Sequence, residues 1–189
     1  NAFVVVLSEM DNSQNANKLL GQNVEEQILL NNIYAIIMQS KSADIALNSV
    51  TELIGDYFHL DRITIIDRDD FTQELCWCKD YKYRHLPLEI DGDTALDCAS
   101  IRDDLSLTSS AFSDTDTNDL TKFGIKSYAI FKLINSGTFD SLIMFQRIEK
   151  EHNWTQRERK QLRNISQIIS SLMMRKETQD KLEQSQKLM

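Results

Sequence analysis

The chain has 189 residues, a length that fits one domain of ordinary size with flanking segments. Its composition, with 41% hydrophobic and 26% charged residues, excludes a disordered chain, and no apolar run approaches the ~20 residues that span a bilayer. The net charge of −8 disfavours nucleic acid and anionic lipid, so we expect neither nucleic-acid binding nor direct membrane contact. The 3 cysteines, an odd number, argue against a disulfide framework and for a reducing, cytoplasmic location.

The N-terminal part combines a short apolar run with a helical pattern. Its first two residues have the character of a cloning scar. Phe3–Leu7 is a β-branched apolar run of strand length, which predicts a strand. From Gln14 to Gln39 apolar residues recur at helical spacing, which predicts one helix or two helices joined at Gly21. A strand that leads through an acidic turn into a polar helix resembles the exit of a PAS domain; an ordinary N-terminal strand is the alternative.

A second helix and a hairpin follow. Ser42 can cap a helix over Ala43–His59, whose apolar residues form one core-facing stripe. Arg62–Asp67 and Glu74–Cys78 read as two strands of a hairpin. Tyr81–His85 predicts a third short strand before the chain's single proline.

The segment Pro87–Leu120 differs in kind, because acidic residues dominate it and Arg102 is its single basic residue. Turn-forming residues leave room for two short helices, near 94–101 and 117–123, and for a strand at Leu105–Ser109. We expect irregular loops of the kind that carry function. A solvated loop explains the acids better than a cation site, since no calcium-loop motif is present.

The C-terminal third predicts a second hairpin and one long helix. Lys126–Ile134 and Phe139–Gln146 are strands joined by a turn at 135–138, and Thr155 with Glu158 forms a capping box. A helix from Thr155 to the last residue would be roughly 50 Å long at ~1.5 Å per residue. Because a domain of this size cannot cover that length, we expect the end of the helix to project.

Five local segments stand out along these elements: Asp44–Val50, Leu60–Ile65, Phe123–Tyr128, Trp154–Glu158 and Leu162–Ile168. Together with the order of the elements, they resemble a GAF domain over about Glu25–Lys176. A proline is frequent in that family where Lys132 stands here, and a glycine where Ser141 stands.

The resemblance implies an α+β fold: a central antiparallel sheet with the N- and C-terminal helices packed on one face. Loops with short helices would cover the other face, often over a small-molecule pocket. We divide the chain into an N-terminal strand and linker helix (1–22), a GAF domain (23–175) and a projecting signalling helix (176–189).

The predicted strands are apolar on both faces, so both faces of the sheet should be covered. We place one set of these residues under the loops, as the lining of a pocket or of a second core. The candidates for a ligand pocket are Ile66, Tyr128, Ile130, Leu142 and Met144, together with Cys98 from the acidic loops.

Thiol chemistry is the alternative to a binding role. Cys98 lies in the loop region where some GAF relatives, the free methionine sulfoxide reductases, use cysteines. Its acidic neighbours Asp93 and Asp97 oppose thiolate formation, and no matching set of cysteines is evident. Cys76 and Cys78 lie two apart on one strand face, where free cysteines commonly pack as small hydrophobes. No metal site and no catalytic group is therefore expected, and the sequence names no cofactor.

What the resemblance implies for function is a non-enzymatic sensory or regulatory input domain of a multidomain bacterial signalling protein, such as a sensory box/GGDEF family protein. It would pass small-molecule or partner signals through its terminal helices to an output domain, such as a diguanylate cyclase, a cyclic di-GMP phosphodiesterase or a histidine kinase. Those helices would also pair two protomers in a homodimer. The alternatives are a thiol-dependent reductase using Cys98 and a purely structural dimerisation module.

Overall fold

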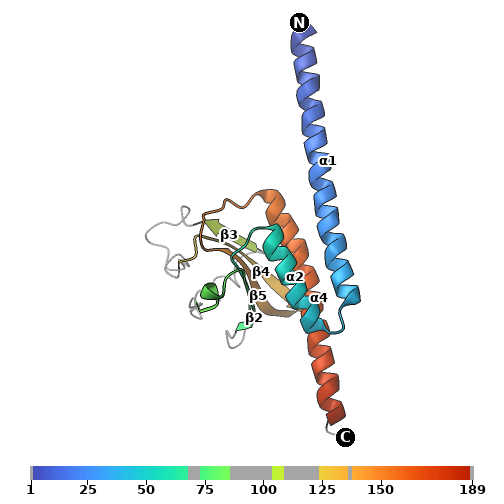
Figure 1. Cartoon of the computed structure of the whole chain (residues 1–189), viewed down its shortest axis with the longest axis vertical. Coiled ribbons are helices and arrows are strands. Elements are labelled where there is room, and N and C mark those ends of the chain that lie inside the picture. Colours follow the sequence, from blue (N-terminus) through green and yellow to red (C-terminus); the bar gives the residue numbers. More distant parts are fainter. Residues whose placement is uncertain (1, 68–72, 86–103, 109–123, 136–137, 188–189) are drawn as a thin grey trace. The chain divides into compact units, whose positions relative to one another are not determined.

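A computed structural model describes residues 2–67, 73–85, 104–108, 124–135 and 138–187 of the chain (Figure 1). The chain divides into two compact units, Asn1–Gln39 and Ser40–Met189. No helix among the described residues is both long and apolar enough to cross a membrane.

The first unit is one helix, α1, over Ala2–Gln39 (Figure 1). It runs without interruption through Gly21, so the single-helix alternative is confirmed. The predicted strand at Phe3–Leu7 is wrong, because these residues form the first turns of α1. A run of five apolar residues fits a helix as well as a strand, and neither glycine nor proline separates it from the helical pattern that follows.

The second unit is built on a five-stranded sheet in the order β2-β1-β5-β4-β3, in which every neighbouring pair is antiparallel. The predicted α+β class with a central antiparallel sheet is confirmed. The strands are β1 (Arg62–Asp67), β2 (Gln73–Cys78), β3 (Asp104–Thr108), β4 (Ser127–Asn135) and β5 (Thr138–Arg147).

Two helices, α2 (Ala43–Tyr57) and α4 (Gln156–Lys187), pack on one face of this sheet (Figure 1). Both begin at the predicted caps. The Ile45 N–H donates to Ser42 Oγ at 3.3 Å, which satisfies one of the free donors at the start of α2. At α4 the Thr155 N–H donates to Glu158 Oε2 (2.8 Å) and the Glu158 N–H to Thr155 Oγ1 (3.1 Å), so the capping box forms.

The packing of α2 on the sheet depends on one glycine. A Cβ atom at Gly55 would lie 2.6 Å from Cζ2 of Trp77 and would also overlap Cη2 and Cζ3 of the same ring. The indole of β2 therefore lies directly on the backbone of α2. On the same face the rings of Phe131 and Phe145 meet edge to face at 5.8 Å. We call this side the helix face; it also carries Ile63, Ile65, Ala129 and Ile143, all 0% exposed.

The residues Tyr81–His85 form a short 3-10 helix, η1, so the predicted third strand there is wrong. Asp80 provides the physical reason. Its side chain accepts a hydrogen bond from the Lys82 N–H at 3.0 Å, and its carbonyl accepts one from the Tyr83 N–H at 3.0 Å. An aspartate that caps its own following backbone favours a turn over an extended strand.

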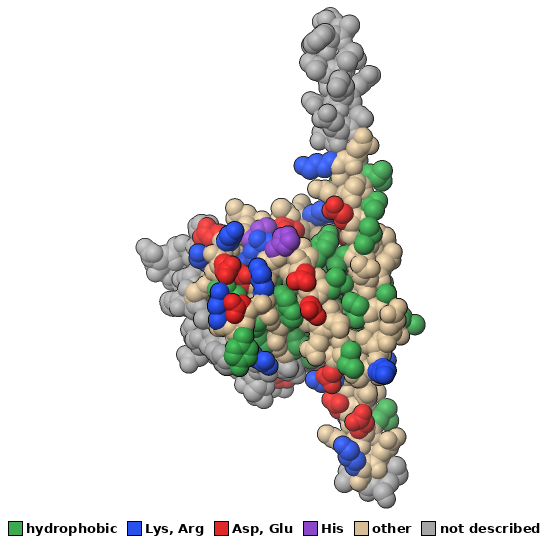
Figure 2. All heavy atoms as spheres, in the orientation of Figure 1, with side chains coloured by type: hydrophobic (Ala, Val, Ile, Leu, Met, Phe, Trp, Pro, Cys, Tyr) green, Lys and Arg blue, Asp and Glu red, His purple; other side chains and the backbone are tan. Residues whose placement is uncertain are grey.

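The last part of α4 is exposed, as the sequence predicts. The 32-residue helix is about 48 Å long at ~1.5 Å per residue, and its buried residues end at Leu172. Every residue from Lys181 to Lys187 is exposed, and Figure 2 shows acidic and basic side chains along this end of the helix.

Candidate functional site

The strand registers collect a second set of side chains on the sheet face opposite α2 and α4, which we call the far face. Side chains alternate along a strand, and paired residues of antiparallel strands share a face. The pairs that define the far face are Arg62 with Cys78, Thr64 with Cys76 and with Met144, Ile66 with Leu142, Ile130 with Met144, and Tyr128 with Gln146.

Five of the six predicted pocket residues come together there. Ile66, Tyr128, Ile130, Leu142 and Met144 share the far face and are 0–3% exposed. The sixth, Cys98, lies outside the described residues, as do the two predicted short helices of the acidic segment. Whether the far face carries a ligand pocket is therefore still a prediction.

Three buried polar side chains accompany the apolar ones on the far face, and sequence reasoning missed all three as site residues. Arg62, Thr64 and Gln146 are each 0% exposed. Arg62 donates from Nε to Gln146 Oε1 and from Nη1 to the carbonyl oxygen of Tyr83 at 3.0 Å. Burial lowers the pKa of the Arg62 guanidinium, while the nearby thiols of Cys76 and Cys78 act in the opposite direction. The signal in the sequence was polar residues at alternate positions of otherwise apolar strands.

Two polar atoms of this cluster have unused hydrogen-bonding capacity. Thr64 Oγ1 and Gln146 Nε2 are buried and find no hydrogen-bond partner among the described residues. Leaving a buried donor or acceptor unpaired costs about 1–3 kcal/mol, so native proteins pair nearly all of them. A hydroxyl and an amide that point from one sheet face can bind the polar groups of a small molecule or of water.

A polar network holds η1 against the segment after β5. The Tyr83 hydroxyl donates to Glu149 Oε1, and Lys82 Nζ lies 3.4 Å from the same oxygen. The hydrogen bond from Tyr83 and then that from Lys82 lower the pKa of Glu149. Burial, followed by the hydrogen bond to Glu149, raises the pKa of Tyr83. Arg62 binds the backbone of the same 3-10 helix. Two contacts therefore hold η1, one from Arg62 on the far face and one from Tyr83 to Glu149.

The segment between β5 and α4 is itself firmly held. The Asp61 carboxylate accepts hydrogen bonds from the N–H groups of Ile148 (2.7 Å) and Glu149 (3.0 Å). His152 Nε2 lies 2.9 Å from Glu158 Oε1, in the first turn of α4. Burial alone would raise the pKa of Glu158, but the hydrogen bonds from Thr155, with His152 nearby, lower it overall. A continuous set of contacts therefore joins the far face to the start of α4.

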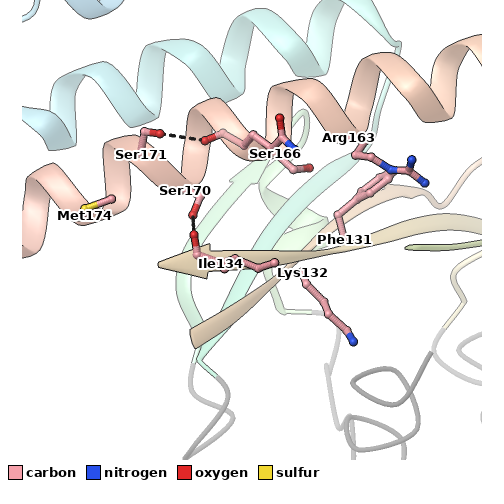
Figure 3. A pocket seen from close by; sticks show the side chains of 9 residues that line it. Phe131, Lys132, Ile134, Arg163, Ser166, Ser170, Ser171 and Met174 are labelled. Carbon is pink, nitrogen blue, oxygen red and sulfur yellow. Dashed lines mark hydrogen bonds between the residues drawn. The ribbon is translucent and has the colours of Figure 1, made fainter. Parts of the chain in front are cut away.

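A groove of about 520 Å³ opens elsewhere in the unit, between β4 and α4 (Figure 3). In Figure 3 Phe131 points toward α4 and Lys132 away from it, and Ser170 Oγ donates to the Ile134 carbonyl at 2.9 Å. None of the five predicted pocket residues that the structure describes lines this groove. The buried hydroxyls in its lining are already paired, since Ser166 Oγ donates to the carbonyl oxygen of Leu162 and Ser170 Oγ donates to that of Ile134. We therefore assign the candidate ligand site to the far face.

Within the described ranges, no group of three or more histidine, cysteine, aspartate and glutamate side chains is placed to hold a metal ion.

No protein-family model and no curated protein matches the sequence significantly. Solved structures do match. The phycocyanobilin-bound GAF domain of a cyanobacterial phytochrome aligns with a TM-score of 0.63 at 14% identity, covering 82% of this chain and 96% of that one. The GAF domain of a phosphoenolpyruvate-protein phosphotransferase from Coxiella burnetii has a TM-score of 0.62 at 12% identity, covering 82% of this chain and 96% of that one. The GAF domain of the Acinetobacter phosphoenolpyruvate-protein phosphotransferase aligns with a TM-score of 0.62 at 13% identity, covering 79% of this chain and 93% of that one.

These likenesses define the class of fold. The chain has the GAF fold, as its sequence predicts, with the sheet order and helix placement described above. At 12–14% identity the likeness concerns the fold and leaves function to the site itself.

Proposed function

We propose that this domain is a non-enzymatic sensory or regulatory input domain that binds a small molecule on the far face. Binding changes the position of α4, and α4 passes this change to an output domain, such as a diguanylate cyclase or a histidine kinase, in a multidomain bacterial signalling protein. The observation that carries the proposal is that two buried atoms, Thr64 Oγ1 and Gln146 Nε2, have no hydrogen-bond partner among the described residues. That one similar structure holds phycocyanobilin supports small-molecule binding by this fold.

Transmission follows from the contacts around Glu149. A ligand on the far face would press on Arg62 and Gln146, and Arg62 holds η1. Through Tyr83 the 3-10 helix contacts Glu149, six residues before Thr155, which caps α4. A displacement of η1 would therefore change how α4 begins, and a rigid helix would carry that change to its exposed end.

We also propose that the terminal helices pair two protomers. Exposed residues of α4 form a seam at helical spacing, at Ser171, Met174, Thr178 and Leu182, the last 59% exposed. In α1, Leu20, Val24 and Ile28 are 64%, 51% and 53% exposed at four-residue intervals, and Figure 2 shows hydrophobic side chains in a row along this helix. Seams with so few apolar residues suit a marginal two-stranded contact, which a signal can rearrange.

The Thr64 hydroxyl offers a direct test. Thr64→Val keeps the shape of the side chain and removes the unpaired hydroxyl, so we expect the ligand-free variant to be as stable as the parent or more stable by about 1 kcal/mol. Urea unfolding followed by circular dichroism measures this. A variant less stable by more than about 1 kcal/mol would mean that the protein itself already satisfies the hydroxyl, and the argument for a ligand there would fail.

Ligands can be sought by thermal shift, with biliverdin, phycocyanobilin and panels of nucleotides and amino acids as probes. A compound bound at the far face should raise the melting temperature of the parent more than that of Thr64→Val. A compound that protects both proteins equally binds elsewhere.

The dimer is tested by light scattering at micromolar concentration. Leu182→Glu in the α4 seam should shift the population toward monomer, whereas Gln184→Glu, on another face of the same exposed turn, should not. A parent protein that is monomeric at every concentration would contradict the dimer proposal.

Two alternatives remain open to experiment. A structural dimerisation module would dimerise and bind none of the probes. A methionine sulfoxide reductase would turn over free methionine sulfoxide with a thiol reductant and lose that activity in Cys98→Ser.

A further inference from the structure

Two cysteines on β2 form a thiol pair that the proposed function does not use. Cys76 Sγ and Cys78 Sγ lie 3.2 Å apart, within the distance of a hydrogen bond between two sulfur atoms. Both side chains are half-buried, and both are free thiols. They share the far face because they are two residues apart on one strand.

From this geometry we propose that Cys76 and Cys78 form a reversible redox site, in which hydrogen peroxide oxidises the two thiols to a Cys76–Cys78 disulfide. This redox site does not depend on the proposed small-molecule site, since it needs only the two thiols and a small oxidant that reaches their half-buried sulfur atoms.

The oxidation of the two thiols to a disulfide takes place in two stages. The sulfur of Cys76 attacks one peroxide oxygen, the O–O bond breaks, and the other oxygen leaves with the thiol proton as water, so that Cys76 becomes a sulfenic acid. The sulfur of Cys78 then attacks the sulfenic sulfur. An S–S bond forms, the S–O bond breaks, and the hydroxyl leaves with the proton of Cys78 as a second water. The two sulfurs together lose two electrons, and the peroxide gains them.

The surroundings assign these separate roles. Burial, then the hydrogen bond with Cys76, raises the pKa of Cys78 to about 12, so Cys78 keeps its proton at neutral pH and can donate to its neighbour. The guanidinium of Arg62, which pairs with Cys78 across the strands, is close enough to stabilise negative charge on either sulfur.

Strand geometry makes such a disulfide strained and therefore easy to reduce. Residues two apart on a strand have Cα atoms about 6.4–6.8 Å apart, at the long end of the roughly 4.4–6.8 Å range found for disulfides. Closing the bond brings the two sulfur atoms closer than 3.2 Å and favours a shorter Cα separation, which bends β2. Among the described strands, β2 is at the edge of the sheet and pairs with β1 alone, with a register shift between Ile65 and Ile66, so it can bend without breaking a central ladder.

The residue between the two cysteines connects this change to the helices. Trp77 points to the helix face, where its ring lies on Gly55 of α2. α2 in turn packs on α4. Bending the strand on one face therefore moves the indole on the other, where its ring lies against the backbone of α2.

The test uses the 189-residue chain with Cys98→Ser, which leaves the pair as the only cysteines. After hydrogen peroxide, the expected result is loss of both free thiols and of two hydrogens by intact mass, with no oxygen retained, no linkage between chains, and full recovery with dithiothreitol. Of the matched controls, Cys78→Ser/Cys98→Ser keeps the attacking thiol and should retain oxygen, whereas Cys76→Ser/Cys98→Ser should form no disulfide within the chain and react more slowly. Oxygen retained on the pair, a disulfide between chains, or two thiols that persist after hydrogen peroxide would each overturn the proposal.

A second readout separates a redox site from two cysteines that merely pack. With Trp154→Phe added, Trp77 is the only tryptophan, and its emission should shift on oxidation and return on reduction, with no shift in either single-thiol control. An unchanged emission despite a formed disulfide would overturn the link to α2.

Discussion

Gly55→Ala tests how α2 is fixed to the sheet. The added methyl would meet three ring atoms of Trp77, the most distant at 2.6 Å, where ordinary contacts begin near 3.4 Å. Either the indole or the helix must move. Overpacking of this kind costs about 1–3 kcal/mol, and the better helix propensity of alanine returns up to about 1 kcal/mol. We expect a net loss of about 1–2 kcal/mol, which lowers the melting temperature by about 2–8 °C.

Urea unfolding followed by circular dichroism measures this loss, and Gly21→Ala is the matched control. Gly21 in α1 has nothing within 4 Å of the position of the new methyl, so this variant should be no less stable than the parent. Adding Trp77→Phe to Gly55→Ala should recover about 1 kcal/mol relative to the sum of the two single changes. A Gly55→Ala variant as stable as the parent would refute the contact between Gly55 and Trp77. So would losses of unfolding free energy that simply add in the Gly55→Ala/Trp77→Phe double variant.

Three further variants test other contacts. Glu158→Gln should cost about 0.3–1 kcal/mol at neutral pH. Because the pKa of Glu158 is lowered in the folded state, its advantage is present above the unfolded value near 4.5 and should vanish as pH falls through the folded value; urea unfolding at a series of pH values checks this. Arg62→Met removes the hydrogen bonds to Gln146 and the Tyr83 carbonyl and should cost at least about 1.5–3 kcal/mol, so a variant of parental stability would show that η1 is held otherwise. Ser42→Ala should cost about 1 kcal/mol through the lost cap of α2, measured in the same assay, and no change would contradict the capping role.

Local signals in the sequence predicted most elements of the fold. The capping residues Ser42 and Thr155 marked the starts of α2 and α4, because a side-chain oxygen next to free backbone donors is a local arrangement. Short runs were harder. Phe3–Leu7 and Tyr81–His85 are each five residues long, and at that length periodicity cannot separate a helix from a strand.

The site was predictable only in part. Alternation along β4 and β5 correctly grouped Tyr128, Ile130 and Met144, since strand parity is a property of the sequence. Arg62 and Gln146 were missed, because their contact joins residues 84 positions apart and depends on the register between β1 and β5. The fit of Trp77 on Gly55 was missed for the same reason, since it depends on how a helix docks on a sheet.

The most direct test of the central claim is the binding affinity of a compound found in the thermal-shift screen. Isothermal titration would compare the parent with Thr64→Val on the far face and with Gln167→Trp, which fills the groove between β4 and α4. We predict about tenfold weaker binding to Thr64→Val, as expected from one lost buried hydrogen bond, and unchanged binding to Gln167→Trp. Unchanged binding to Thr64→Val together with lost binding to Gln167→Trp would place the ligand in the groove and contradict the account.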